Sequence, residues 1–232
     1  MPPDAGAAEV TGLRVLLVAD LLTRTAEMRN LQVFTVLAYD GEPGGQLDAL
    51  ERAVDALGIH RPAARASSGQ AVASLGGPVD VHLVSNGAHP GDQLSGLVTP
   101  VGAARVHRTG EAADDLLGGH ESAEVRLALL SVPYRQPADL TESVLADARA
   151  TVSNWRLRVA EWAESPSRPV PKQISEKARE TFDDLDTPST LALLNDLESD
   201  TDLPAGAKFE AFLYADRVLG LDLPADIGRA AR

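Results

Sequence analysis

The stretch RLALLSVPYRQPADLTESVLADARATVSNWRLRVAEW, residues 126–162, decides how the chain is organised. An apolar run ends at Pro133, and the polar corner 134–136 separates it from a second proline, Pro137. Each proline lacks a backbone donor and biases the residue before it toward extended geometry, so no helix fits between the two. The pattern predicts a fixed corner, with the Tyr134-Arg135 pair exposed, between an apolar segment and a long helix.

The helix predicted after this corner carries a strict heptad pattern. Thr141 is suited to cap its N-terminus, and apolar residues then recur at alternating spacings of three and four. These apolar residues are Leu145, Ala148, Val152, Trp155, Val159 and Trp162. Further helices are expected after a cap at Ser175, after a cap at Thr187 and over 208–219. Residues 123–232 are therefore predicted to form a helical bundle domain.

The first part of the chain has a different pattern. Residues 13–18 are an apolar, β-branched run typical of a buried strand, a helix is expected over 20–30, and 32–38 indicates a second strand. Strand, helix and strand make a βαβ unit, whose strands pair in parallel. The other elements predicted are a helix with one apolar stripe over 47–57 and strands over 79–85 and 103–106. Residues 1–122 are thus predicted to form an α/β domain.

The composition of the 232-residue chain limits its function. The net charge of −13, from 21 basic and 34 acidic residues, argues against general binding to nucleic acid. No apolar run approaches the ~18 residues that cross a membrane, and no signal-peptide pattern is visible at the N-terminus. The chain contains no cysteine, so it has neither disulfides nor thiolate metal sites. We therefore expect a cytoplasmic protein that does not bind membranes.

The charge is distributed unevenly. Residues 149–179 hold seven basic and three acidic side chains, a net charge of +4, whereas residues 183–202 hold seven acidic and no basic ones. A solvated helix face explains such runs more often than a ligand does.

Three segments resemble cysteinyl-tRNA synthetases, in the order in which that family has them. Residues 124–148, with Tyr134-Arg135-Gln136-Pro137, are similar to the family's leucine-rich helix and its "His-Tyr-Arg-Ser-Pro" corner. Residues 183–188 are similar to its "DDLNTP" element, and 215–223 look like the helix that closes its bundle. The mycothiol-pathway cysteine ligase belongs to the same family. The resemblance implies an α/β fold, a shortened class I synthetase-type parallel sheet (Rossmann-like, HUP), followed by an α-helical bundle.

The sequence departs from this family at its phosphate-binding elements. The family's His-Ile-Gly-His tetrapeptide aligns with residues 9–12, where Glu9 would repel phosphate. Its mobile Lys-Met-Ser-Lys-Ser loop aligns with residues 108–115, which begin with Arg108 and contain three acids and no lysine. We therefore expect no catalytic residue.

The zinc-binding element also differs from the family pattern. Val79-Asp80-Val81-His82 looks like the family's "FDIH" element, and His89 aligns with a zinc-binding histidine. Gln93 stands where the family has a glutamate, and the family's cysteines are missing. We expect no zinc and no other metal. The candidate ligand-binding residues are Asp80, His82, His89, Arg108, Tyr134 and Arg135.

Two functions fit these observations. The first is a synthetase-like protein that has lost the ATP-binding, mobile-loop and zinc motifs and has a non-catalytic binding or regulatory role. Its ligand would be a nucleotide, an amino acid or a tRNA. The second is an ATP-dependent cysteine or amino-acid ligase that works with substitute residues and uses ATP. The sequence does not indicate an oligomeric state.

Overall fold

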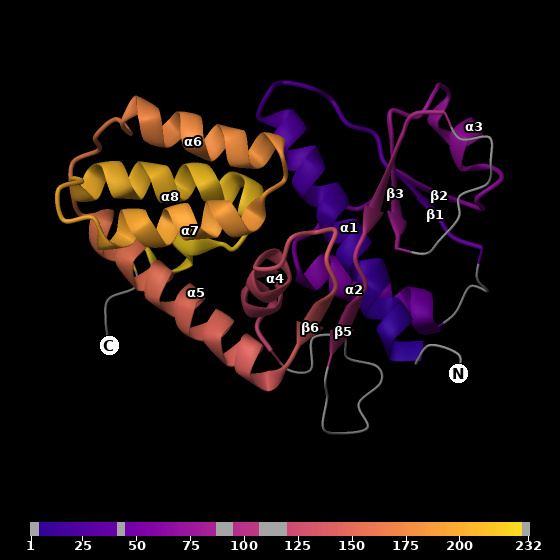
Figure 1. The fold of residues 1–232 in the computed structure, drawn as a ribbon, viewed down its shortest axis with the longest axis horizontal. Coiled ribbons are helices and arrows are strands. Elements are labelled where there is room, and N and C mark those ends of the chain that lie inside the picture. The colour runs from indigo at the N-terminus through magenta and orange to yellow at the C-terminus, as the bar shows by residue number, and fades with distance from the viewer. Residues whose placement is uncertain (1–4, 41–44, 87–94, 107–119, 229–232) are drawn as a thin grey trace. The chain divides into compact units, whose positions relative to one another are not determined.

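A computed structural model describes residues 5–40, 45–86, 95–106 and 120–228. Within them the protein is a mixed α/β structure with eight α-helices and three parallel strand pairs (Figure 1). The chain divides into two compact units: Met1–Gly119 with Tyr134–Leu140, and His120–Pro133 with Thr141–Arg232. The single domain boundary expected between residues 122 and 123 stays a prediction, as does the cytoplasmic location.

The first unit is built on a long helix, α1, which spans Ala5–Glu27. The strand predicted over 13–18, and with it the βαβ unit, is wrong. Leu13 and Leu17 are each only 1% exposed, and α1 packs against α2, β3, β4 and β5. A helix that is covered on most sides has no regular polar face, so its sequence is apolar in a way that also suits a buried strand.

The strands of the first unit form three separate two-stranded sheets, all parallel. They replace the continuous sheet expected from the sequence in the part of the chain that the structure describes. The strand pairs are β1 (Val36–Ala38) with β2 (Ala64–Ala66), β3 (Val81–Ser85) with β4 (Leu97–Val101), and β5 (Ala104–Val106) with β6 (Ala138–Leu140). The sequence predicts β1, β3 and β5, in longer versions, but not β2, β4 or β6.

Two shorter helices belong to the first unit, α2 (Gly45–Ala56) and α3 (Ala71–Leu75). The apolar stripe predicted for the 47–57 helix is confirmed, because all four of its residues are buried. They are Leu47, Leu50, Val54 and Leu57.

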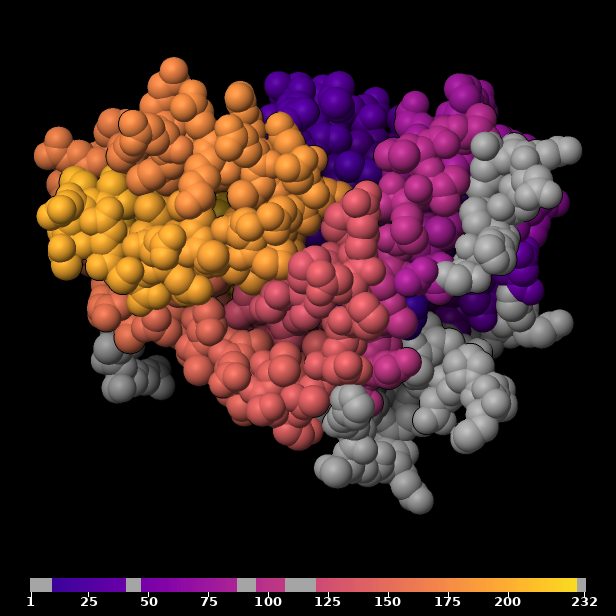
Figure 2. Space-filling model, viewed as in Figure 1, coloured from indigo at the N-terminus to yellow at the C-terminus, as the bar shows by residue number. Residues whose placement is uncertain are grey.

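The second unit is helical. Its elements are α4 (Ser122–Leu130), α5 (Glu142–Trp162), α6 (Lys172–Asp183), α7 (Thr187–Ser199), α8 (Ala205–Leu219) and the 3-10 turn η1 (Leu223–Asp226). All six residues of the predicted heptad pattern are buried in α5. The rings of Trp155 and Trp162 both meet Phe212 of α8 edge-on, with centroids 5.6 and 5.0 Å away. Figure 2 shows α6, α7 and α8 as one continuous orange and yellow surface.

The helix caps agree with the sequence in one case of three. The hydroxyl of Thr141 accepts the N–H of Val144 at the start of α5, as predicted. The cap of α7 is Asp186 rather than Thr187, since Asp186 accepts the N–H of Ser189 and the helix itself begins at Thr187. The Thr187 hydroxyl donates to the main-chain oxygen of Leu130 at 2.6 Å. Ser175 lies inside α6 and caps nothing, since this helix begins at Lys172.

No helix in the described ranges is long and apolar enough to cross a membrane.

Candidate functional site

The positions aligned with the family's phosphate-binding tetrapeptide, residues 9–12, lie inside α1. Val10 is 4% exposed, and the hydroxyl of Thr11 both donates to the main-chain oxygen of Ala104 and accepts its N–H, at 3.2 and 3.1 Å. Thr11 thus ties α1 to β5, and Val10 belongs to the core of the first unit.

A buried cation, Arg14, lies one helical turn further along α1 and is 1% exposed. Its Nη1 lies 3.2 Å from the main-chain oxygens of Gly102 and Ala103, and it also donates to the main-chain oxygen of Gln136. Burial lowers the pKa of the guanidinium, but arginine remains charged in proteins. Arg14 therefore holds the β4–β5 connection and the corner together as a charged donor.

The corner at residues 134–137 is fixed by main-chain contacts. The N–H of Gly102 donates to the oxygen of Tyr134 at 2.8 Å, and the N–H of Ala138 donates to Ala103 at 2.9 Å, where β6 begins. A side chain at Gly102 would place its Cβ 2.2 Å from the oxygen of Gln136, so this close approach requires glycine. The fixed corner predicted from the two prolines is confirmed.

The two side chains of the corner differ in exposure. Tyr134 is half-buried, whereas Arg135 is exposed, with its guanidinium 5.2 Å from the centroid of the Tyr134 ring. Such stacking limits the freedom of the arginine side chain. The corner therefore presents a positioned guanidinium to solvent, which can bind a carboxylate or a phosphate.

Asp80 and His82 lie away from this corner. His82 pairs with Val98 in the β3–β4 register, whereas the corner adjoins Gly102, just past the last paired residue, Val101. The four residue steps from Val98 to Gly102, at about 3.3 Å each, separate the two places by roughly 13 Å. Asp80 precedes β3 and is further still. The predicted site residues described by the structure thus form two places, not one.

The ring of His82 has a structural partner. Its Nε2 lies 2.8 Å from the main-chain oxygen of Ser95, just before β4. The other two predicted residues, His89 and Arg108, lie outside the described residues. The described parts of the chain contain no group of three or more metal-binding side chains. The expected absence of zinc stays a prediction.

A second buried charge was not predicted from the sequence. The Asp20 side chain is fully buried, and its Oδ1 lies 2.6 Å from Nδ1 of His60 and 3.0 Å from the His60 main-chain nitrogen. Its Oδ2 accepts from Nε of Arg24 at 2.9 Å. The only sign of this buried charge in the sequence is that Asp20 is a single acid within an apolar run. The contacts join α1 to the segment after α2, which indicates a structural role.

No known protein-family profile matches the chain. Over 120 residues, 51% of its length, the chain is 37% identical to a cysteine–tRNA ligase of Methylocella silvestris. Over 78 residues it is 38% identical to the L-cysteine:1D-myo-inositol 2-amino-2-deoxy-alpha-D-glucopyranoside ligase of Streptomyces griseus. The chain is a relative of these cysteine ligases.

This cysteine-ligase relative corresponds to only part of the enzymes that it matches. The matched segment is 24% of the Methylocella ligase and 18% of the Streptomyces ligase. A third relative, ligase 2 of that name from Corynebacterium jeikeium, is 33% identical over 110 residues, which are 45% of this chain and 26% of the ligase. Activities that belong to the whole enzymes are therefore not assigned to this chain by similarity alone.

Proposed function

We propose that this protein is a non-catalytic binding or regulatory relative of the cysteine ligases. The carrying observation is that Val10 and Thr11, two positions of the aligned tetrapeptide, are used for packing within the first unit. Val10 is buried there, and Thr11 exchanges two hydrogen bonds with Ala104 of β5. In this proposal the ligase scaffold is kept while its phosphate-binding surface has been converted into core.

The chemistry of adenylate formation supports the same proposal. The reaction needs donors or cations on the phosphates as charge shifts onto pyrophosphate. The chain has Glu9 at the aligned tetrapeptide, and Glu111 and Asp114 at the aligned mobile loop. Each lost donor of this kind costs about 10² to 10³ in rate, and acids in their place add repulsion.

The proposal extends to the fold and the ligand. We take the three parallel strand pairs to be the remainder of a class I synthetase-type (HUP) sheet that has lost its continuity. Ligand binding would use the exposed guanidinium of Arg135, which is stacked on Tyr134 and suits a phosphate or a carboxylate. The ligand classes that carry these groups are a nucleotide, an amino acid or a tRNA.

Calorimetric titration with ATP, with cysteine and with total tRNA tests this binding role. We expect at least one of the three to bind, with an affinity about tenfold lower in Arg135→Ala, because one charge-assisted hydrogen bond is lost. Arg52→Ala, which removes an exposed arginine of α2, should leave the affinity unchanged. If neither ATP, cysteine nor tRNA binds, the proposed binding role is contradicted.

An ATP-dependent cysteine or amino-acid ligase is the alternative. The similarity to cysteine–tRNA ligases over about half of the chain favours it. Arg105 of β5 is exposed and lies close in sequence to Arg108, so the two could supply cations to the phosphates. In that case ATP would be bound, and turnover would depend on these arginines.

A further inference from the structure

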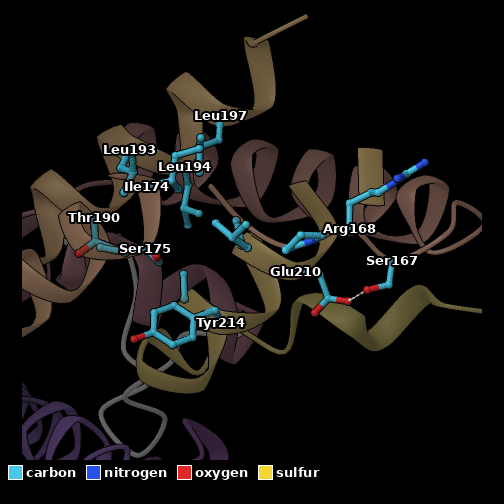
Figure 3. A pocket seen from close by; sticks show the side chains of 15 residues that line it. Ser167, Arg168, Ile174, Ser175, Thr190, Leu193, Leu194, Leu197, Glu210 and Tyr214 are labelled. Atoms are coloured by element: carbon cyan, nitrogen blue, oxygen red, sulfur yellow. Dashed lines mark hydrogen bonds between the residues drawn. The ribbon is translucent and has the colours of Figure 1, made fainter. Parts of the chain in front are cut away.

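A cavity of about 530 Å³ lies in the second unit, between α6, α7, α8 and the segment 167–170 (Figure 3). Its volume falls within the ~300 to 1,000 Å³ of small-molecule sites. The cavity takes no part in the function proposed above, which rests on residues of the first unit.

Small side chains on facing helices leave this space open. Ala211 and Ala215 lie one turn apart on α8, and Ala178 faces the cavity from α6. Ile174 from α6 and Leu194 from α7 add larger apolar side chains to the walls. An apolar ligand body of several carbons would therefore be better placed here than in water.

One end of the cavity carries a positioned acid. Glu210 of α8 accepts a hydrogen bond from the hydroxyl of Ser167 at 2.6 Å, and Figure 3 shows the two side chains together at that end. No ion pair of Glu210 is found among the described residues. Arg168, on the same rim, is exposed and directs its guanidinium away from the cavity (Figure 3).

Two hydroxyl groups of the cavity lining, those of Thr190 and Ser175, already donate to partners within the protein. Thr190 donates to the hydroxyl of Thr181 at 2.8 Å, and Ser175 donates to the main-chain oxygen of Lys172 at 2.8 Å. The protons of these two hydroxyls are therefore already used, and Glu210 is the acid among the residues that line the cavity, so a cationic group belongs at its end. Residues 167–215, which contain every residue that lines the cavity, hold ten acids and five bases, and this excess of negative charge favours a cation.

We propose that this cavity binds a small amphipathic amine. Its apolar body fills the space between α6, α7 and α8, and its ammonium group pairs with Glu210. Glu210 thus selects the charged head group of the ligand, while the alanines on α6 and α8 determine how large its apolar part can be.

Three eight-carbon probes with different head groups test the proposal by calorimetry: octylamine, octanoate and 1-octanol. Octylamine should bind most tightly and octanoate most weakly. Glu210→Gln keeps the shape of the side chain and removes its charge, so it should weaken octylamine about tenfold or more and leave 1-octanol nearly unchanged. Glu164→Gln, at an exposed acid after α5, is the matched control and should change neither.

Ala211→Leu tests the location of the site. The larger side chain should fill the cavity and abolish octylamine binding, while thermal unfolding reports whether the variant remains folded. Octylamine binding that persists in folded Ala211→Leu, or that is equal in Glu210→Gln and the unchanged protein, would overturn the proposal. So would octanoate that binds as tightly as octylamine, or octylamine that does not bind the unchanged protein.

Discussion

Arg14 and Gln136, which are 122 positions apart in the sequence, are joined by a hydrogen bond from the guanidinium to the main-chain oxygen. The same guanidinium lies 3.2 Å from the main-chain oxygen of Gly102. A buried charge on α1 thus fixes the corner that carries Tyr134 and Arg135. The position of the exposed Arg135 therefore depends on the buried Arg14, through the main chain of the corner.

Replacing Arg14 with methionine should lower the free energy of unfolding by about 2 to 4 kcal/mol, because buried carbonyl oxygens lose a charged donor. Urea unfolding measures the change. Arg52→Met, at an exposed arginine of α2, is the control and should cost less than about 0.5 kcal/mol. Equal effects of the two substitutions would show that Arg14 does not hold the corner.

Trp155→Ala tests the core of the helical unit. The indole is 1% exposed, and its Nε1 donates to a carboxylate oxygen of Glu198 at 3.1 Å. Truncation should cost about 3 to 5 kcal/mol, the range for buried aromatic residues. Leu157→Ala, on the exposed face of the same helix at 54% exposure, should change little. An unchanged melting temperature in Trp155→Ala would contradict the packing described for α5.

The acid side of the stability profile should depend on Glu124, whose side chain is 6% exposed. Burial raises its pKa, but the hydrogen bond and charge of Arg149, with smaller contributions from Glu121 and His120, outweigh burial and hold the pKa below its ordinary value. The resulting stability is present above the unfolded-state pKa of about 4.3 and is lost as the pH falls through the lower folded-state pKa.

Glu124→Gln should therefore flatten the loss of stability on acidification, measured as the urea midpoint at neutral pH and at successively lower pH. Glu161→Gln removes an acid with 49% side-chain exposure, paired with Arg158, and should leave the profile nearly unchanged. If both variants follow the unchanged protein throughout, the ion pair of the buried Glu124 with the exposed Arg149 does not control the loss of stability in acid.

The protein should purify without stoichiometric zinc. The soft thiolate ligands that would select this metal are missing, since the chain contains no cysteine. Elemental analysis of the purified protein gives the metal content directly. One equivalent of zinc that disappears in His82→Ala or His89→Ala would show that histidines and carboxylates form a site.

The predictable parts of the fold are those with a local pattern. Helix α5 has one buried face and one exposed face, so the heptad spacing of its apolar residues is visible in the sequence. The corner is predicted by the two prolines, Pro133 and Pro137. The period of α1 is hidden because Leu13, Arg14 and Leu17 are all buried. The contact between Arg14 and the corner spans 122 positions and leaves no local signal.

The candidate site was harder to predict than the fold. Asp80 and His82 were grouped with Tyr134 by family resemblance, but the β3–β4 register places them toward the opposite end of the strands. The cavity in the helical unit depends on small side chains from two helices, Ala178 of α6 and Ala211 of α8, which both line it. Tertiary packing brings these residues to one cavity, and the order of the residues gives no sign of it.

Amino-acid-dependent exchange of labelled pyrophosphate into ATP tests the central claim most directly, with a cysteine–tRNA ligase assayed alongside as the positive control. We predict no exchange above the protein-free background, with cysteine or with any other standard amino acid. The reason is that the family resemblance aligns Glu9 and the acids at 111 and 114 with positions that need donors and cations. Clear exchange that is abolished by Arg108→Ala would contradict the account and identify the protein as a working ligase.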